Sequence, residues 1–177
     1  MSTNTLMTVE EYLHTSFEDG DREYVDGEIV ERNMGEWDHG KIQCFLGYLF
    51  LRMATQAGGL SVLTDIRVRI NSTRYRIPDV AVWLERDAGA DHNGIPVAAP
   101  FIVVEIFSPE DRMSRVTPKM EEYLSIGVLW VWLINPYKET AILYTPANPE
   151  GSPCPVLRTQ NPEIEISLER VLQLQAD

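Results

Sequence analysis

The sequence predicts an α/β fold in which a mixed central sheet is flanked by helices, and three features lead to this. Residues 100–107 (PFIVVEIF) and 128–136 (VLWVWLINP) are apolar on both faces, as is typical of central strands covered by helices on each side. Between 38 and 57, apolar residues recur at helical spacing, which predicts a long amphipathic helix. This alternation of helices and strands, at a length suited to one core, predicts a single domain over residues 1–177.

Two short elements are expected before the long helix. Thr8 can cap a short helix, with Glu11 three residues later completing a capping box. Asp26-Gly27 lies in the middle of REYVDGEIVERN and indicates a two-residue hairpin turn between short strands. Gly58-Gly59 is expected to end the long helix.

Two strands are expected in the middle of the chain. SVLTDIRVRI (61–70) alternates apolar and polar residues, and NSTR (71–74) makes a turn into a second strand, YRIPDVAVWLE (75–85). Pro78 in that second strand indicates an edge, a bulge or an irregular end where the backbone bends toward a site.

The last third of the chain continues the pattern. Residues 108–127 are expected to form a loop and then a helix, with Pro118 in the first turn of that helix. A strand over 138–145 and a loop over 146–155 follow, and the chain ends with a short strand and a helix at 168–174.

The net charge of −12 argues against a generic nucleic-acid binder, but the charge is unevenly distributed. Residues 1–38 contain eleven acids and two arginines, whereas residues 41–78 contain one acid and six basic residues. The middle of the chain is therefore compatible with binding DNA, although charged residues on strands are usually only a solvated face.

The remaining composition is that of an ordinary globular protein. No apolar run is long enough to span a bilayer and no signal peptide is evident, so we expect a cytoplasmic protein that does not bind membranes. Cys44 falls within the apolar helical pattern and is expected to be a core side chain, and Cys154 lies in a proline-rich loop.

Two carboxylates stand where a charge is costly. Glu105 lies inside PFIVVEIF and Asp79 interrupts IPDVAVW, and a charge buried in such strands must be paired or must bind a metal. Two acids without a basic partner on their own strands would repel each other unless a cation such as Mg²⁺ or Mn²⁺ neutralised them. The alternative is that Glu105 pairs with an arginine from another element and that Asp79 caps a turn.

The order of these segments resembles the PD-(D/E)XK nuclease superfamily, and specifically its stand-alone Uma-type branch of restriction-endonuclease-like proteins. The resemblance covers nearly the whole chain and rests on seven segments in family order. These are MTVEEYL, REYVDGEIVE, His39 at the start of the long helix, RIPDVAVW, VVEIFSPEDR, PKMEEYLSIGV and WVWLINP. The resemblance implies a restriction-endonuclease-like core and metal-dependent hydrolysis of phosphodiester bonds, with DNA as the expected substrate.

The resemblance also implies a set of site residues. Asp79 and Glu105 match the two metal-binding acids, the backbone carbonyl of Ile106 matches a further ligand, and Glu23 matches an acid that often joins the metal site. The expected lysine position, two residues after Glu105, is occupied by Phe107.

In the Uma-type branch the lysine comes from the following helix, where Lys119 stands, with Tyr123 one turn later. The alternative for Lys119 is an exposed helix lysine that pairs with a neighbouring glutamate. His39 matches a histidine at the start of the family's long helix and has either an active-site role or a capping role.

Basic residues in two segments are candidates for binding phosphates. Four of them alternate on the two middle strands: Arg67, Arg69, Arg74 and Arg76. Arg112 and Arg115 follow Glu105 and could hold phosphates or pair with the acids.

Three functions remain open at this point. The first is a Mg²⁺- or Mn²⁺-dependent endonuclease, the second a nuclease-fold binding or assembly protein without turnover, and the third a hydrolase of another phosphoester. Apolar residues around 45–50 and in VLWVWL suggest a homodimer, which would supply the two sites that a two-strand cut needs.

Overall fold

The largest sheet of the protein, seen in a computed structural model that describes residues 6–18, 20–32, 36–55 and 57–174, has six strands. Its strands are β3 (Leu60–Thr64), β6 (Val80–Leu84), β7 (Ile102–Ile106), β8 (Trp130–Asn135), β9 (Thr140–Thr145) and β10 (Asn148–Pro153). Their order is β10-β9-β8-β7-β6-β3, with β7 and β8 parallel and the other neighbours antiparallel. The sheet is therefore mixed, as predicted, with the two apolar segments at its centre.

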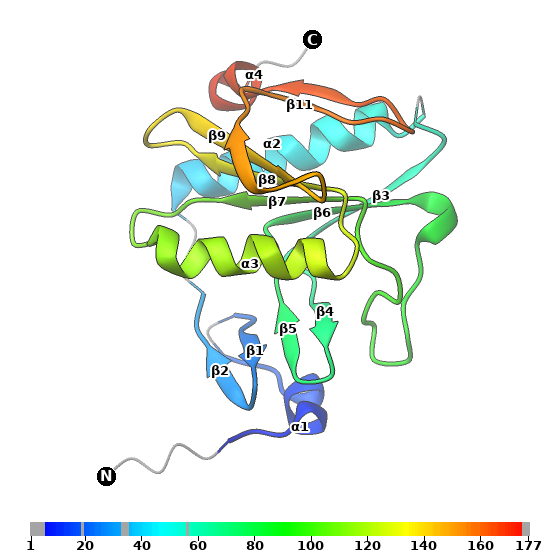
Figure 1. The fold of residues 1–177 in the computed structure, drawn as a ribbon. Helices are drawn as coiled ribbons and strands as arrows, with labels where there is room; N and C mark the ends of the chain where they lie inside the picture. The colour runs from blue at the N-terminus through cyan, green and yellow to red at the C-terminus, as the bar shows by residue number, and fades with distance from the viewer. Residues whose placement is uncertain (1–5, 19, 33–35, 56, 175–177) are drawn as a thin grey trace.

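Helices cover both faces of this sheet (Figure 1). On one face, α2 (Trp37–Met53) and α4 (Leu168–Gln173) pack against side chains such as Ile102 and Val104. On the other face, α3 (Met113–Ser125) packs against Val103 and its neighbours on β8. Because successive side chains of a strand point to opposite faces, Glu105 lies on the α3 side of β7.

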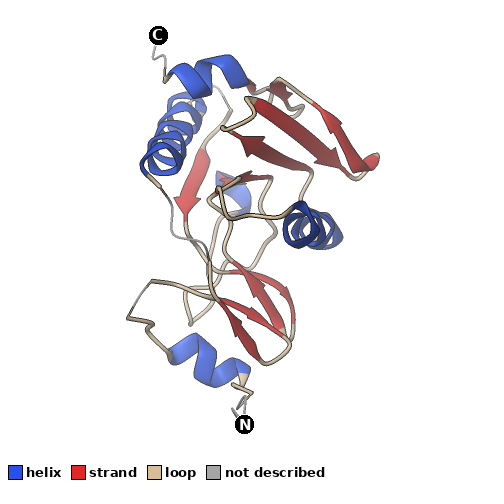
Figure 2. Ribbon diagram, turned by 90° about the vertical axis from the view of Figure 1, so that its left-hand side faces the viewer, coloured by secondary structure: helices blue, strands red, loops and turns tan. Residues whose placement is uncertain are grey.

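A smaller antiparallel sheet lies beside the N-terminal helix. It consists of β1 (Glu23–Val25), β2 (Glu28–Val30), β4 (Val68–Asn71) and β5 (Arg74–Arg76), in the order β2-β1-β5-β4. Tyr12 of α1 (Val9–His14) packs on Tyr24 and Tyr75 of this sheet. Figure 2 shows the small sheet and α1 as a layer below the six-stranded sheet.

Both middle strands are divided between the two sheets, which corrects the prediction of one strand over 61–70 and another over 75–85. The first is broken at Asp65, whose φ of 52° is left-handed, a conformation that aspartate tolerates better than most residues. The second is broken around Pro78, which cannot donate a ladder hydrogen bond. Asp79 therefore stands where the chain passes from the small sheet to the large one.

The N-terminal turn signals are confirmed. Thr8 accepts from the backbone N–H of Glu11 while the Glu11 carboxylate accepts from the backbone N–H of Thr8, which completes the capping box. Asp26 and Gly27 have φ values of 51° and 98°, as a tight turn between paired β1 and β2 requires.

Three other boundaries differ from the prediction. Helix α2 ends at Met53, before the glycine pair, and the segment 146–155 contains β10 rather than only a loop. The two prolines within β10, Pro149 and Pro153, are accommodated because β10 is an edge strand with a register shift. The C-terminal segment also has two paired strands instead of one, β11 (Val156–Arg158) and β12 (Glu165–Ser167).

Pro118 lies in the second turn of α3, not in the first as predicted. Helix α3 begins at Met113, earlier than expected. Because Ser114 is exposed, water can serve the carbonyl that loses its helical donor to Pro118.

The exposed apolar side chains of α2 differ from those expected. Cys44 is exposed rather than part of the core. The strand VLWVWL is largely buried and offers little surface to a partner, so the argument for a homodimer from this strand is wrong. Large exposed apolar side chains remain on α2 at Trp37, Tyr48 and Leu51, and the homodimer stays a prediction.

In the described part of the chain, no helix has the length and apolar character that crossing a membrane requires.

Candidate active site

The two sheets and two helices enclose a cleft of about 540 Å³. The small sheet contributes residues of β1 and β2, and the large sheet contributes the end of β7. The polar and charged residues that line the cleft are Glu23, Glu31, Arg32, His39, Arg76, Asp79, Glu105, Ser108, Asp111, Arg115 and Lys119. The predicted acids and the predicted lysine therefore line one cavity.

Asp79 is buried, with 4% of its surface exposed, and is held by three elements. Its Oδ2 accepts the backbone N–H of Ile106 at 2.7 Å and lies 3.3 Å from Nε2 of His39 on α2. Its Oδ1 accepts from the guanidinium of Arg32 at 2.8 Å. Asp79 therefore does more than cap a turn, because its carboxylate links β7, α2 and the segment after β2.

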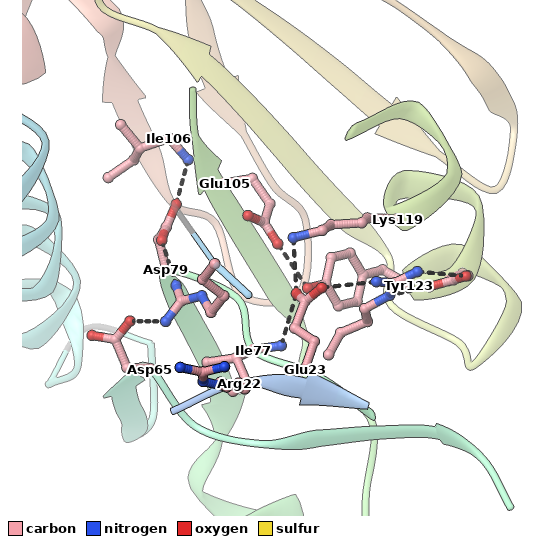
Figure 3. A network of polar contacts seen from close by, with 12 residues as sticks. Arg22, Glu23, Asp65, Ile77, Asp79, Glu105, Ile106, Lys119 and Tyr123 are labelled. Atoms are coloured by element: carbon pink, nitrogen blue, oxygen red, sulfur yellow. Dashed lines mark hydrogen bonds and ion pairs between the residues drawn. The ribbon is translucent and has the colours of Figure 1, made fainter. Parts of the chain in front are cut away.

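Glu105 lies across the sheet from Asp79. The antiparallel register pairs Val80 with Val104, and continuing it by one residue sets Asp79 opposite Glu105. The Tyr123 hydroxyl donates to Oε1 of Glu105 at 2.7 Å (Figure 3). Burial raises the pKa of Glu105 to about 7 in spite of the positive charge of Lys119, and repulsion from Asp79 adds to the rise. Glu105 is thus a buried carboxyl without an arginine partner among the described residues.

Glu23 is more deeply buried, at 1% exposure, yet its charge is balanced. One oxygen accepts from Arg76 at 2.7 Å and the other from Lys119 at 2.8 Å. Burial acts to raise the pKa of Glu23, but these two cations outweigh it and lower the pKa. Both carboxylate oxygens of Glu23 are therefore occupied by protein cations, and one of these cations is Lys119.

Lys119 projects from α3 toward both glutamates, as Figure 3 shows. Burial acts to lower the pKa of Lys119, but the negative charges of Glu105 and Glu23 outweigh it and raise the pKa. The ammonium is therefore kept charged inside the cleft. The alternative of an exposed helix lysine is wrong, since Lys119 is mostly buried and its partner comes from β1.

A clamp that the sequence did not reveal fixes α3 against the small sheet. Glu122, one turn after Lys119, accepts from Arg76 at 2.5 Å and from Arg74 at 2.7 Å. Spacing on the helix alone could have suggested that Glu122 shares a face with Lys119. Its arginine partners could not be inferred, because they come from a strand far away in the sequence.

His39 is buried near the start of α2 and contacts Asp79. Burial acts to lower its pKa, but the hydrogen bond and the charge of Asp79 outweigh it and raise the pKa of His39. The contact with Asp79 places His39 in the site rather than in a helix cap.

The arginines predicted to bind phosphates divide into two groups. Arg67 pairs with Asp21 and donates to carbonyls at the end of α1, Arg69 pairs with Asp91, and Arg74 pairs with Asp26. None of these three lines the cleft, and neither does Arg112, whereas Arg76 and Arg115 do.

The acids form a partial donor set for a divalent ion. Among the described residues, no group of three or more His, Cys, Asp or Glu side chains is arranged to hold a metal. Mg²⁺, however, usually keeps several waters and binds through one or two carboxylates together with substrate phosphates. Asp79 and Glu105 are two such carboxylates. Burial and, to a smaller extent, repulsion from Asp79 raise the pKa of Glu105, and a bound cation would offset both effects. The donor set therefore fits a largely hydrated Mg²⁺ or Mn²⁺.

Comparisons with known proteins identify the family and the fold. A family model described as "Uma2: Putative restriction endonuclease" matches residues 9–177. A crystal structure described as a "putative nuclease belonging to DUF820" from Anabaena variabilis superposes with a TM-score of 0.80 at 22% identity, covering 94% of this chain and 98% of that chain. This likeness confirms the predicted restriction-endonuclease-like fold, while no curated protein matches the chain. Because the family model spans almost the whole chain, the protein belongs to the Uma2 family of nuclease-like proteins.

Proposed function

We propose that this protein is a Mg²⁺- or Mn²⁺-dependent endonuclease that hydrolyses phosphodiester bonds in DNA. One observation carries the proposal. A buried glutamate with a raised pKa, Glu105, faces a second buried acid, Asp79, and a charged lysine, Lys119, in one cleft. Perturbed titratable groups gathered in a cleft are typical of active sites.

The chain's own residues would divide the work of hydrolysis. A bound divalent ion would supply an activated water near neutral pH and Lewis-acid contact with the scissile phosphate. Asp79, Glu105 and the backbone carbonyl of Ile106 would hold that ion, and Tyr123 fixes the Glu105 carboxylate through its hydrogen bond. His39 and the Ile106 N–H fix the carboxylate of Asp79.

Lys119 would stabilise the negative charge that develops on the phosphate. Its ammonium is already oriented by Glu23, so little reorganisation is needed when the charge appears. The clamp of Arg76 on Glu23 and Glu122 keeps the helix that carries Lys119 in place.

Arg112 and Arg115 are the arginines best suited to bind the DNA backbone. Both are exposed in the segment that begins α3, Arg115 lines the cleft, and neither forms an ion pair with another described residue. The arginines on the small sheet, by contrast, are neutralised by carboxylates, so we assign them a structural role there.

Cleavage of supercoiled plasmid with and without Mn²⁺ tests the proposal. Wild-type protein should nick or linearise the plasmid only with the metal, and Asp79→Asn and Glu105→Gln should both be inactive. Asp87→Asn and Glu165→Gln, which change exposed acids outside the cleft, serve as matched controls and should remain active. Circular dichroism would verify that each variant is folded. Full activity in either Asp79→Asn or Glu105→Gln would refute the assignment.

A second candidate is a nuclease-fold protein that binds or assembles without turnover. Phe107 at the usual lysine position and the guanidinium of Arg32 on Asp79 both favour it. Calorimetric titration with Mn²⁺ separates the two candidates. The endonuclease should bind Mn²⁺ and lose this binding in Asp79→Asn, whereas a protein that neither binds metal nor turns over should give no such binding signal.

A further inference from the structure

Arg32 occupies the side of Asp79 that a metal ion would use. Its guanidinium donates to Oδ1 of Asp79 at 2.8 Å and to Oδ1 of Asp65 at 2.7 Å. The other oxygen of Asp79 is taken by the Ile106 N–H and is close to His39. Oδ1 is therefore the oxygen left for an ion, and a protein cation already contacts it.

The surroundings of Arg32 are those of a cation site. Burial disfavours the charge of Arg32, but Asp79, Asp65 and Glu105 together outweigh it and raise its pKa. Arg32 thus interacts with both acids that would hold the ion. A guanidinium and a divalent ion that share these acids would repel each other, so both cannot stay close to Asp79 at once.

Asp65 provides a second anchor for Arg32. It stands at the break between β3 and β4, and its Oδ2 accepts from Gln43 of α2 at 2.7 Å. Gln43 also donates to the backbone carbonyl of Asp79 at 2.9 Å, so Asp65 and Asp79 are braced by one side chain. An arginine that leaves Asp79 can remain paired with Asp65, and because it lines the cleft it would then face the bound phosphate.

We propose that Arg32 is a positioning residue that holds Asp79 while no metal is bound and that must release Asp79 before a divalent ion can bind. The proposal rests on the metal site proposed above. Its consequence is that Arg32 weakens metal binding, since part of the binding free energy is spent on breaking a pair that is mostly shielded from water. A residue with a purely structural role would have the opposite effect, because its loss would disorder Asp79 and weaken binding.

Calorimetric titration with Mn²⁺ tests this for the wild type, Arg32→Gln and Arg69→Gln. Arg32→Gln should bind Mn²⁺ about tenfold more tightly, a change that corresponds to about 1.4 kcal/mol. Arg69→Gln is the matched control, because it removes the same charge from an arginine–aspartate pair outside the cleft lining, and its affinity should stay near that of the wild type.

A second variant tests the anchor without the risk of unfolding. Asp65→Asn is isosteric and asparagine tolerates the left-handed conformation, so this variant should fold. It should weaken Mn²⁺ binding several-fold in the wild-type background, because a released Arg32 loses its other partner. In the Arg32→Gln background the effect should become much smaller, and this double-mutant cycle separates the loss of the anchor from a general loss of negative charge.

Melting temperatures without metal give a readout that does not depend on the ion. Arg32→Gln should melt about 5 °C below the wild type, and saturating Mn²⁺ should raise its melting temperature more than that of the wild type. If the wild type binds Mn²⁺ and Arg32→Gln binds it equally or less tightly, the inference about Arg32 is wrong while the metal site stands. If neither protein binds Mn²⁺, the proposed function fails and the inference with it.

Discussion

The small sheet and the large sheet each place a buried glutamate in the same cleft, and the two glutamates are in opposite electrostatic states. Glu23 of the small sheet is paired with Arg76 and Lys119, which lower its pKa. Glu105 of the large sheet has a tyrosine hydroxyl as its hydrogen-bond partner, and burial raises its pKa to about 7. Burial is similar in the two cases, so the difference lies in direct contacts: Glu23 accepts hydrogen bonds from two cations, whereas Glu105 accepts one from a neutral hydroxyl and is repelled by Asp79. The comparison separates a carboxylate that two cations neutralise by direct contact from one that accepts a hydrogen bond only from a hydroxyl among the described residues.

The largest effect on stability is expected for Glu23→Gln. Removing this charge leaves Arg76 and Lys119 buried without their shared partner, which should lower the free energy of unfolding by about 3–5 kcal/mol. Urea denaturation would measure the change. Glu31→Gln is the control, because the Glu31–Arg22 pair is exposed and contributes little. If Glu23→Gln were as stable as Glu31→Gln, the conclusion that Glu23, unlike Glu105, stabilises the fold would be wrong.

Lys119→Met should reduce kcat for plasmid cleavage by about 10²–10³-fold, because it removes a preorganised positive charge from the reacting phosphate. Lys138→Met changes an exposed lysine outside the cleft and should leave kcat unchanged. If Lys119→Met lost stability but kept its activity, the catalytic role of Lys119 would be wrong, and Lys119 would act only as the ion-pair partner of Glu23.

Glu105→Gln should stabilise the metal-free protein by about 3 kcal/mol near pH 8. The ordinary pKa of a glutamate is 4.5 and that of Glu105 is about 7, so the folded protein retains this proton over a range in which the unfolded chain has lost it. Stability should therefore fall as the pH rises from about 4.5 through about 7. The part of this fall below about pH 6.5 should be absent in Glu105→Gln, whereas His39, whose pKa is raised from 6.5, contributes to a fall only above that pH. Thermal melts at several pH values with a chelator present would check this, and a lower melting temperature for Glu105→Gln at pH 8 would contradict it.

The smallest effects are expected at the rim of the cleft. Arg112→Gln and Arg115→Gln should each weaken DNA binding and reduce the slope of log affinity against log salt by about 1, because each removes one phosphate contact. Fluorescence anisotropy with a labelled duplex would measure both. Arg69→Gln should leave the slope unchanged, since Arg69 is paired with Asp91. An equal loss of slope in Arg69→Gln would show that the small sheet binds DNA as well.

Much of the fold could be predicted because its signals are local. The capping box at Thr8, the Asp26-Gly27 turn and the apolar runs of β7 and β8 each depend on a few neighbouring residues. The division of the middle strands between two sheets could not be predicted, because alternation looks the same whether or not a strand changes its partner. The left-handed Asp65 marks that change only once the backbone is known.

The candidate site could be predicted in part for the same reason. Asp79 and Glu105 stand out as charges inside apolar strands, and Lys119 and Tyr123 were found through the family resemblance. Arg32, Gln43 and Glu122 were missed, since each gains its importance from a partner distant in the sequence. A polar residue in a polar segment carries no sign of such a partner.

The central claim is that Asp79 and Glu105 share one divalent ion. Crystals grown with Mn²⁺ and measured for anomalous scattering test it most directly. We expect one strong anomalous peak about 2.1 Å from a carboxylate oxygen of each residue, with the Arg32 guanidinium displaced from Asp79. Fully bound Mn²⁺ elsewhere, with Arg32 still on Asp79 and no peak between the two acids, would contradict it.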